Sequence, residues 1–161
     1  MASVLQKIVD RKHYTFLDKK VSWQEAIKLS CEPLVADGSV DANYHEQIVE
    51  CATEYGPYFV FEHYVAMPHT QEDAAGIHKT SIGFMVCKEP IDFGKDEDGE
   101  QKEAKLFFTL ASCDPNEHID NISQLMEIFT NEPLLDALMN AKSADDILKA
   151  EKDFPNTEED F

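Results

Sequence analysis

The segment 104–113 constrains the fold of this chain more than any other part of the sequence. Its apolar residues fall at both odd and even positions, which predicts a strand that is buried on both faces. A strand of this kind needs a layer of structure on each side of its sheet. The residues that carry the pattern are Leu106, Phe107, Phe108 and Leu110.

Patterns typical of helices and of further strands flank this segment. Ser22-Trp23-Gln24-Glu25 is a capping box that begins a helix, which Pro33 should kink or end early. Gly56-Pro57 should end a second helix over 42–55. Other helices are predicted at 2–10, 117–129, 132–140 and 143–152, and other strands at 13–17, 58–61, 65–67 and 79–87.

These elements predict an α/β fold, with a mostly buried sheet of four or five strands and helices on both of its faces. The chain has 161 residues, which suits one domain over 1–150. The acid-rich segment 88–103 reads as a loop, and 151–161 as an acidic, mobile tail. In the helix over 117–129, the residues expected to face inward are Ile119, Ile122, Met126 and Phe129.

Charge and hydropathy exclude several classes of partner. The formal net charge is −18, so nucleic acid and an anionic membrane surface would be repelled, whereas a basic protein would be attracted. High solubility is the alternative explanation of this charge. No apolar run approaches the roughly 20 residues that span a bilayer, and the N-terminus lacks the apolar core of a signal peptide. We therefore expect a cytoplasmic protein. The four cysteines form no Cys-x-x-Cys pair and are expected to be buried, reduced thiols.

Two histidines follow predicted strands. His69 comes after the extended segment 65–67 and Pro68, whose ring restricts the backbone. His118 opens the helix that follows 104–113. Ligands of open α/β sheets collect at the carboxyl ends of strands, so both imidazoles could belong to one site.

The residues at this predicted site suit a phosphohistidine. The chain lacks a Gly-rich phosphate loop, a Gly-x-Ser-x-Gly elbow and a His-Glu-x-x-His helix. A neutral imidazole can attack phosphorus, and the helix start at His118 offers free N–H groups for an anion. We expect His69 to be the nucleophile and His118 a supporting donor, with Thr70 and Thr80 as candidate phosphate-binding hydroxyls.

Other roles for these side chains stay open at this point. Either histidine could be purely structural. A zinc site could also be drawn from residues of the right type, although their spacing matches no known ligand pattern, and we expect neither a metal nor a cofactor. The residues of that alternative are Glu62, His63, His69, Asp73, His78 and His118.

The order of these motifs resembles a known family. Val65-Ala66-Met67-Pro68-His69 and Ile77-His78-Lys79-Thr80-Ser81-Ile82 are similar to the active-site region of enzyme IIA of the bacterial phosphoenolpyruvate-dependent sugar phosphotransferase system (PTS), mannitol/fructose type. Gly56-Pro57-Tyr58-Phe59-Val60 and Asp114-Pro115-Asn116-Glu117-His118 look most like its ascorbate branch. The resemblance extends from Ser22 to Lys149.

The resemblance implies a fold and a function. The fold would be a mixed five-stranded sheet flanked by helices. His69 would accept a phosphoryl group from the phosphohistidine of the carrier HPr, and His118 would support it. The group would pass to a cysteine of an enzyme IIB and then to the sugar carried by the membrane component enzyme IIC. A regulatory module that senses phosphorylation without feeding transport is the alternative. Neither the oligomeric state nor the sugar follows from the sequence.

This chain departs from the family pattern at three places. Many members have glycine five residues before the histidine and directly after it, where this chain has Tyr64 and Thr70. The backbone there would need another route to any left-handed conformation. Members of the mannitol and fructose branches tend to have an arginine in the helix before the motif. The segment 42–55 has none, which favours the ascorbate branch.

Overall fold

The computed structural model describes residues 3–70 and 75–155. Its five-stranded sheet has the order β1-β4-β5-β3-β2. The β1–β4 and β3–β5 pairs are parallel, and the β4–β5 and β2–β3 pairs are antiparallel. The strands are β1 (Tyr14–Leu17), β2 (Val60–Phe61), β3 (Val65–Ala66), β4 (Ser81–Lys95) and β5 (Gln101–Ala111).

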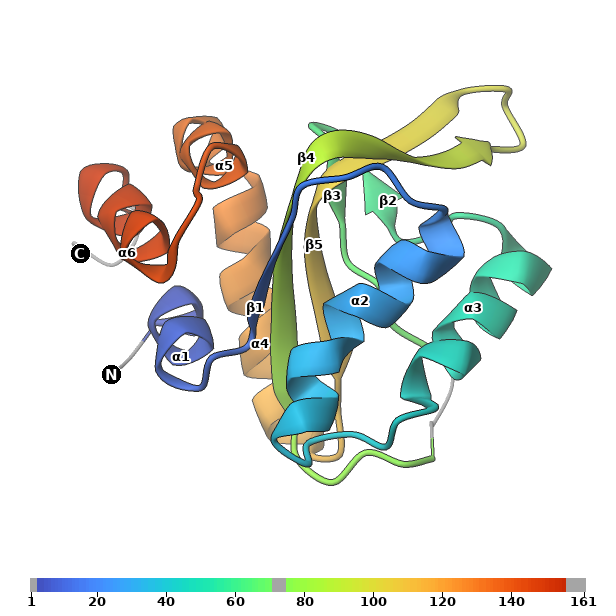
Figure 1. Ribbon diagram of the computed structural model, residues 1–161, viewed down its shortest axis with the longest axis horizontal. Coiled ribbons are helices and arrows are strands. Elements are labelled where there is room, and N and C mark those ends of the chain that lie inside the picture. The colour runs from blue at the N-terminus through green and yellow to red at the C-terminus, as the bar shows by residue number, and fades with distance from the viewer. Residues whose placement is uncertain (1–2, 71–74, 156–161) are drawn as a thin grey trace.

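Helices cover both faces of this sheet (Figure 1). On one face lie α2 (Trp23–Ala36) and α3 (Tyr44–Tyr55), and on the other lie α1 (Val4–Asp10), α4 (Pro115–Phe129), α5 (Glu132–Met139) and α6 (Ala144–Asp153). Each face has its own apolar core. Phe108 belongs to the core under α4 and α5, and the adjacent Phe107 belongs to the core under α2 and α3. The prediction of a mixed α/β sandwich with a sheet buried on both faces is confirmed.

The helix starts follow from capping residues. The Ser22 hydroxyl accepts a hydrogen bond from the Glu25 N–H at 3.2 Å, as the capping box predicts. Of the two effects predicted for Pro33, an early end of the helix is wrong, because α2 continues to Ala36. Burial of Leu34, the residue after the proline, holds the last turn against the sheet and offsets the missing backbone bond.

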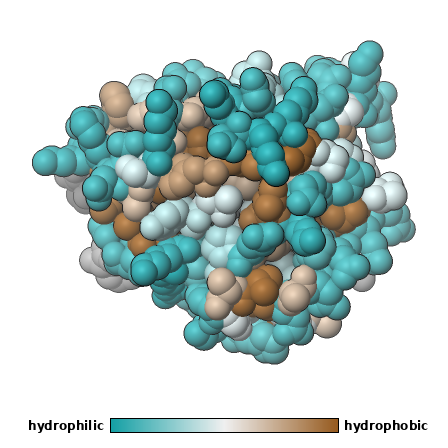
Figure 2. Space-filling model, in the orientation of Figure 1, coloured by the Kyte–Doolittle hydropathy of each residue, from teal (hydrophilic) through white to brown (hydrophobic). Residues whose placement is uncertain are grey.

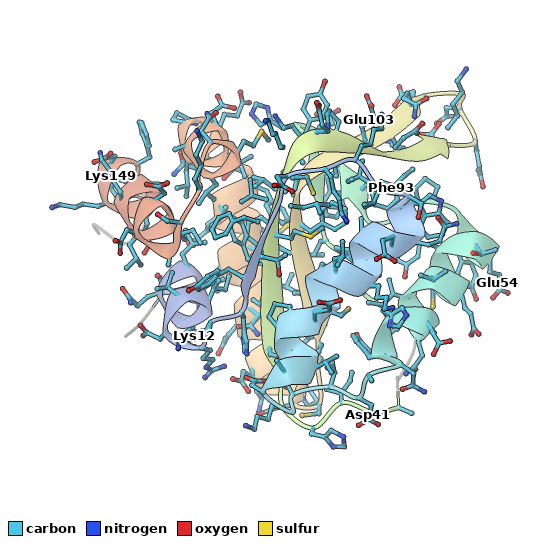
Figure 3. The ribbon with its side chains drawn as sticks, in the orientation of Figure 1. Lys12, Asp41, Glu54, Phe93, Glu103 and Lys149 are labelled. Carbon is cyan, nitrogen blue, oxygen red and sulfur yellow. The ribbon has the colours of Figure 1, made fainter. Side chains whose placement is uncertain are left out.

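The expectation of a loop over 88–103 is also wrong, because β4 and β5 continue through it as a long hairpin. The strand register shifts between Val86 and Ile91 and again before Lys95, and such bulges let a strand accommodate Pro90 and Gly94. Phe93 points from this hairpin toward α2 (Figure 3), and its ring centroid lies 6.0 Å from that of Trp23. This contact packs the otherwise polar segment 88–103 against α2 through an apolar side chain.

The buried face of α4 differs from the predicted one. Ile119 and Met126 are 63% and 40% exposed, whereas Ile122 and Phe129 are partly buried as expected. The residues of α4 that are buried are Asn121, Leu125 and Ile128. Both sets have helical spacing, so periodicity does not distinguish them, and packing against the neighbouring helices decides which stripe faces inward.

The C-terminal region differs from the sequence expectation in part. Helix α6 continues to Asp153, which places three residues of the predicted tail in regular structure, and residues 156–161 lie outside the described part of the chain. Among the described helices, none is both long and apolar enough to cross a membrane. Figure 2 shows a band of apolar surface on one face, bordered by hydrophilic side chains.

Candidate active site

The strand order brings His69 and His118 to one end of the sheet. Strands β3 and β5 are adjacent and parallel. The segments that follow them therefore leave the sheet at the same end. His69 follows β3, and His118 lies in the first turn of α4, which follows β5. The two imidazoles are close enough for the charge of His118 to affect the pKa of His69. The prediction that these histidines meet is therefore supported by the geometry.

The backbone before His69 is held on both sides. The Met67 N–H donates to the Phe59 carbonyl at 2.9 Å, and the Leu110 N–H donates to the Pro68 carbonyl at 2.9 Å. Both Met67 and Pro68 are buried. The half-buried His69 is thus held by a fixed backbone just after the carboxyl end of β3.

The two ring nitrogens of His69 have different environments. Nδ1 lies 2.6 Å from the Met67 carbonyl oxygen. A carbonyl can only accept, so Nδ1 carries the proton in the neutral ring, and Nε2 keeps its lone pair. No described residue forms a hydrogen bond with Nε2. The ring is therefore the tautomer whose nucleophilic nitrogen is Nε2.

Tyr58 holds both the backbone and the ring of His69. Its hydroxyl donates to the His69 carbonyl oxygen, and its ring packs edge-on against the imidazole with centroids 5.2 Å apart. Burial raises the pKa of the Tyr58 hydroxyl, so the phenol stays a donor at neutral pH. The sequence predicts no role for Tyr58, although its place directly after Gly56-Pro57 is a usable signal.

The environment of His69 favours its neutral form. Burial is the largest cause that lowers its pKa below the ordinary value of 6.5, and a nearby positive charge on His118 lowers it further. The Met67 carbonyl opposes these two effects by stabilising the protonated ring. The net direction is downward, so His69 has a free lone pair across the neutral pH range.

His118 lies where α4 begins, in a turn ordered by its capping residue. The Asp114 side chain accepts from the Asn116 N–H at 3.0 Å, and the Asp114 carbonyl accepts from the His118 N–H at 3.0 Å. The half-buried side chain of His118 adds a ring donor beside the positive end of the helix dipole.

The two predicted phosphate-binding threonines have partners within the protein. The Thr80 hydroxyl accepts from the Cys113 and Asp114 N–H groups at 2.9 and 3.0 Å, and it is 5% exposed. In this structure Thr80 ties β4 to the start of α4. Thr70 follows His69 directly and hydrogen-bonds the Tyr44 hydroxyl, which itself donates to the Leu110 carbonyl at 2.7 Å. Direct contact of either threonine with phosphate stays a prediction.

Two other residues of the zinc alternative pair with carboxylates elsewhere. His63 pairs with Asp136 at 2.9 Å, and the exposed His78 pairs with Asp41 at 2.8 Å. Asp73 lies outside the described residues. Within the described ranges, no group of three or more potential ligands is placed to hold a metal ion.

The cysteines are only partly as expected. Cys31 and Cys87 are buried, and burial raises the pKa of each thiol to about 12, so both stay protonated. Cys51 is half-buried and Cys113 is exposed. All four are free thiols.

At position 64, where many family members have glycine, the backbone is left-handed although the residue is tyrosine. His63 and Tyr64 have φ angles of 64° and 61°, in the left-handed region that costs a residue with a side chain about 1–2 kcal/mol. The Tyr64 carbonyl accepts from the Lys105 and Leu106 N–H groups at 2.8 and 3.1 Å. These bonds and the His63–Asp136 pair hold the turn that leads into β3.

Comparison with known proteins shows the family of this chain. The family described as "Phosphoenolpyruvate-dependent sugar phosphotransferase system, EIIA 2" matches residues 8–152. The chain belongs to this family. The ascorbate-specific PTS system EIIA component of Escherichia coli strain K12 is 30% identical to this EIIA chain over 128 residues, which are 79% of this chain and 80% of that relative. The resemblance noted in the sequence is thereby confirmed.

Solved structures give the same fold. The crystal structure of IIA mannitol from Escherichia coli is 28% identical, with a TM-score of 0.69, over 86% of this EIIA chain and 96% of that one. The complex of enzyme IIAMtl with phosphorylated enzyme IIBMtl, also from Escherichia coli, matches at 27% identity and a TM-score of 0.69, over 88% and 95%. As an EIIA family member, the protein is a PTS phosphocarrier component.

Proposed function

We propose that this protein accepts a phosphoryl group from phospho-HPr on Nε2 of His69 and passes it to a cysteine of an enzyme IIB, for uptake of ascorbate or a related sugar acid or pentitol. One observation carries the proposal: Nδ1 of His69 is occupied by the Met67 carbonyl at 2.6 Å, which leaves Nε2 as the nucleophile. The ascorbate-specific relatives at 30% identity support the substrate class.

The transfer consists of two displacements at phosphorus. In the first, the Nε2 lone pair of neutral His69 forms an N–P bond while the N–P bond of phospho-HPr breaks, and the HPr imidazole leaves. In the second, the thiolate of the IIB cysteine forms an S–P bond while the bond to Nε2 breaks. Nδ1–H keeps its bond to Met67 throughout, and the protein contributes mainly positioning and stabilisation of charge.

The surface around the site suits transient docking of partners. Ile119, the residue after His118, is 63% exposed, and Met126 on the same helix is 40% exposed. We expect these two side chains to contact a docked partner. The net charge of −18 would speed encounter with a basic carrier. Passage of the sugar through enzyme IIC would then use phosphoryl groups supplied from the cytoplasm.

Reconstitution tests this proposal. The protein is incubated with phosphoenolpyruvate, enzyme I and HPr, and its intact mass is followed. We expect a gain of one phosphoryl group that is labile in acid and stable in alkali. Added ascorbate-type IIB should then remove it. Phosphorylation without transfer to any IIB would instead favour the regulatory alternative.

His118 should speed the transfer without being the acceptor. In His118→Ala, we expect phosphorylation of His69 to persist at a rate reduced about 10-fold or more, because one donor to the phosphoryl oxygens is lost. The pKa of His69 should rise in the same variant, because a nearby positive charge is removed. Quench-flow rates and NMR titration measure the two effects. Unchanged values of both would remove His118 from the mechanism.

Tyr58 should position His69. Tyr58→Phe keeps the edge-on ring contact but removes the hydrogen bond to the His69 carbonyl. We expect the maximal transfer rate to fall up to about 10-fold, with little change in the concentration of phospho-HPr giving half that rate. Tyr14→Phe, in β1, is the matched control. A fall in thermal stability with no change in rate would show that Tyr58 is only structural.

A further inference from the structure

A cavity lies away from His69, between the sheet and the α5–α6 connection. Its volume is about 500 Å³, within the range typical of small-molecule sites. The Lys105 N–H donates to the Tyr64 carbonyl just before β3 begins, whereas His69 follows the end of β3. The cavity and the proposed phosphorylation site are therefore at opposite ends of this strand. Its lining residues include Phe16, Val86, Met139, Lys88, Lys105 and Lys142.

The charge of this lining is opposite to that of the protein. Lys88, Lys105 and Lys142 face one acid, Asp18, in a chain with 32 acidic residues against 14 basic ones. Among the described residues, none of these three ammonium groups forms an ion pair, whereas Lys102 and Lys149 do. Three cations against one acid at the same cavity create a local positive potential.

The fold brings these lysines together from separate segments. Lys88 comes from β4, Lys105 from β5 and Lys142 from the chain between α5 and α6. Val86 pairs with Leu106 and Ile91 with Ala104, so the bulged segment 87–90 stands opposite Lys105. Bulges redirect side chains and are common beside binding sites. The irregular register thus places Lys88 and Lys105 at the same cavity.

We propose that this cavity, here called the lysine cavity, binds a small organic anion that carries a phosphate or carboxylate on an apolar or ring-shaped body. The three ammonium groups would hold the anionic group. The side chains of Phe16, Val86 and Met139 would contact the body. The proposal does not depend on phosphoryl transfer at His69, because no residue of that site lines the cavity.

NMR titration with phenyl phosphate tests the lysine cavity. This probe joins a dianion to one apolar ring. We expect saturable amide shifts at Asp18, Lys88, Lys105 and Asn140, with a dissociation constant on the order of 1 mM. Phenol and inorganic phosphate should each bind several-fold more weakly, because each lacks one half of the contacts. Absence of saturable shifts at these amides would overturn the proposal.

Substitutions then assign the binding to the lysines. Lys88→Gln combined with Lys142→Gln should weaken phenyl phosphate binding about 5-fold or more, while Lys149→Gln, at a paired lysine outside the cavity, should leave it unchanged. The same titration on His69→Ala separates any phosphate binding at the other site. Equal affinity of the double variant and the starting protein, with both folded by circular dichroism, would contradict the assignment.

Discussion

Replacing His69 with alanine is expected to abolish phosphoryl transfer from phospho-HPr. Nδ1 of His69 is hydrogen-bonded to the Met67 carbonyl, and the ring lies near His118 at the carboxyl end of β3. No other imidazole in the described ranges has both of these features. The measurement is the intact mass after incubation with phosphoenolpyruvate, enzyme I and HPr. We expect no detectable gain, with the far-UV circular dichroism unchanged.

His78→Gln is the matched control for this experiment. His78 is an exposed histidine whose ring pairs with Asp41, so its loss should leave phosphorylation at the level of the starting protein. A full mass gain in His69→Ala would reject His69 as the acceptor. If only His78→Gln lost the phosphoryl mass gain, His78 would be the acceptor.

The same site predicts how transfer depends on pH. The folded pKa of His69 is lowered below its ordinary value of 6.5, so the ring stays neutral and nucleophilic somewhat below that pH. Transfer should fall only as the pH drops through the lowered pKa. The unfolded chain binds a proton here first, so this group makes folding less favourable as the pH falls from 6.5 through the folded pKa. NMR titration of the His69 ring should give the same midpoint as the rate.

Gly83→Ala is expected to be the most destabilising single-methyl change in the sheet. An added Cβ would lie 2.6 Å from the Ser30 carbonyl oxygen of α2 and 3.5 Å from Leu34 Cγ. The oxygen belongs to the backbone, so no side-chain rotation relieves the contact, and α2 must move off β4. Such overpacking costs about 1–3 kcal/mol, which lowers the melting temperature by roughly 2–12 °C.

The effect should come from the close approach of α2 rather than from loss of a glycine as such. Gly99 has a φ of 81°, and an added Cβ there meets nothing within 4 Å. Gly99→Asn should change the free energy of unfolding by less than about 1 kcal/mol, because asparagine tolerates the left-handed region. Calorimetry on both variants compares the two. Equal stability of Gly83→Ala and the starting protein would show that α2 does not rest on Gly83.

Several parts of the fold could be predicted because their signals are local. The Ser22 cap, the stop at Gly56 and the doubly apolar strand around Phe107 each depend on residues close in sequence. The hairpin beyond Cys87 was not predictable, because its polar residues are typical of a loop and only the fold shows that Phe93 packs against Trp23. The buried stripe of α4 was also missed, since two stripes of this helix have suitable spacing.

The sequence by itself determined that His69 follows a strand and that His118 lies at the start of a helix after another strand, because alternation, capping and proline act within a few residues. Only the tertiary structure decided that these two places are adjacent, that Nδ1 of His69 is hydrogen-bonded to the Met67 carbonyl, and that the Tyr58 hydroxyl donates to the His69 carbonyl. Those facts depend on the pairing of β3 with β5 and on packing between segments distant in sequence, which no local pattern records.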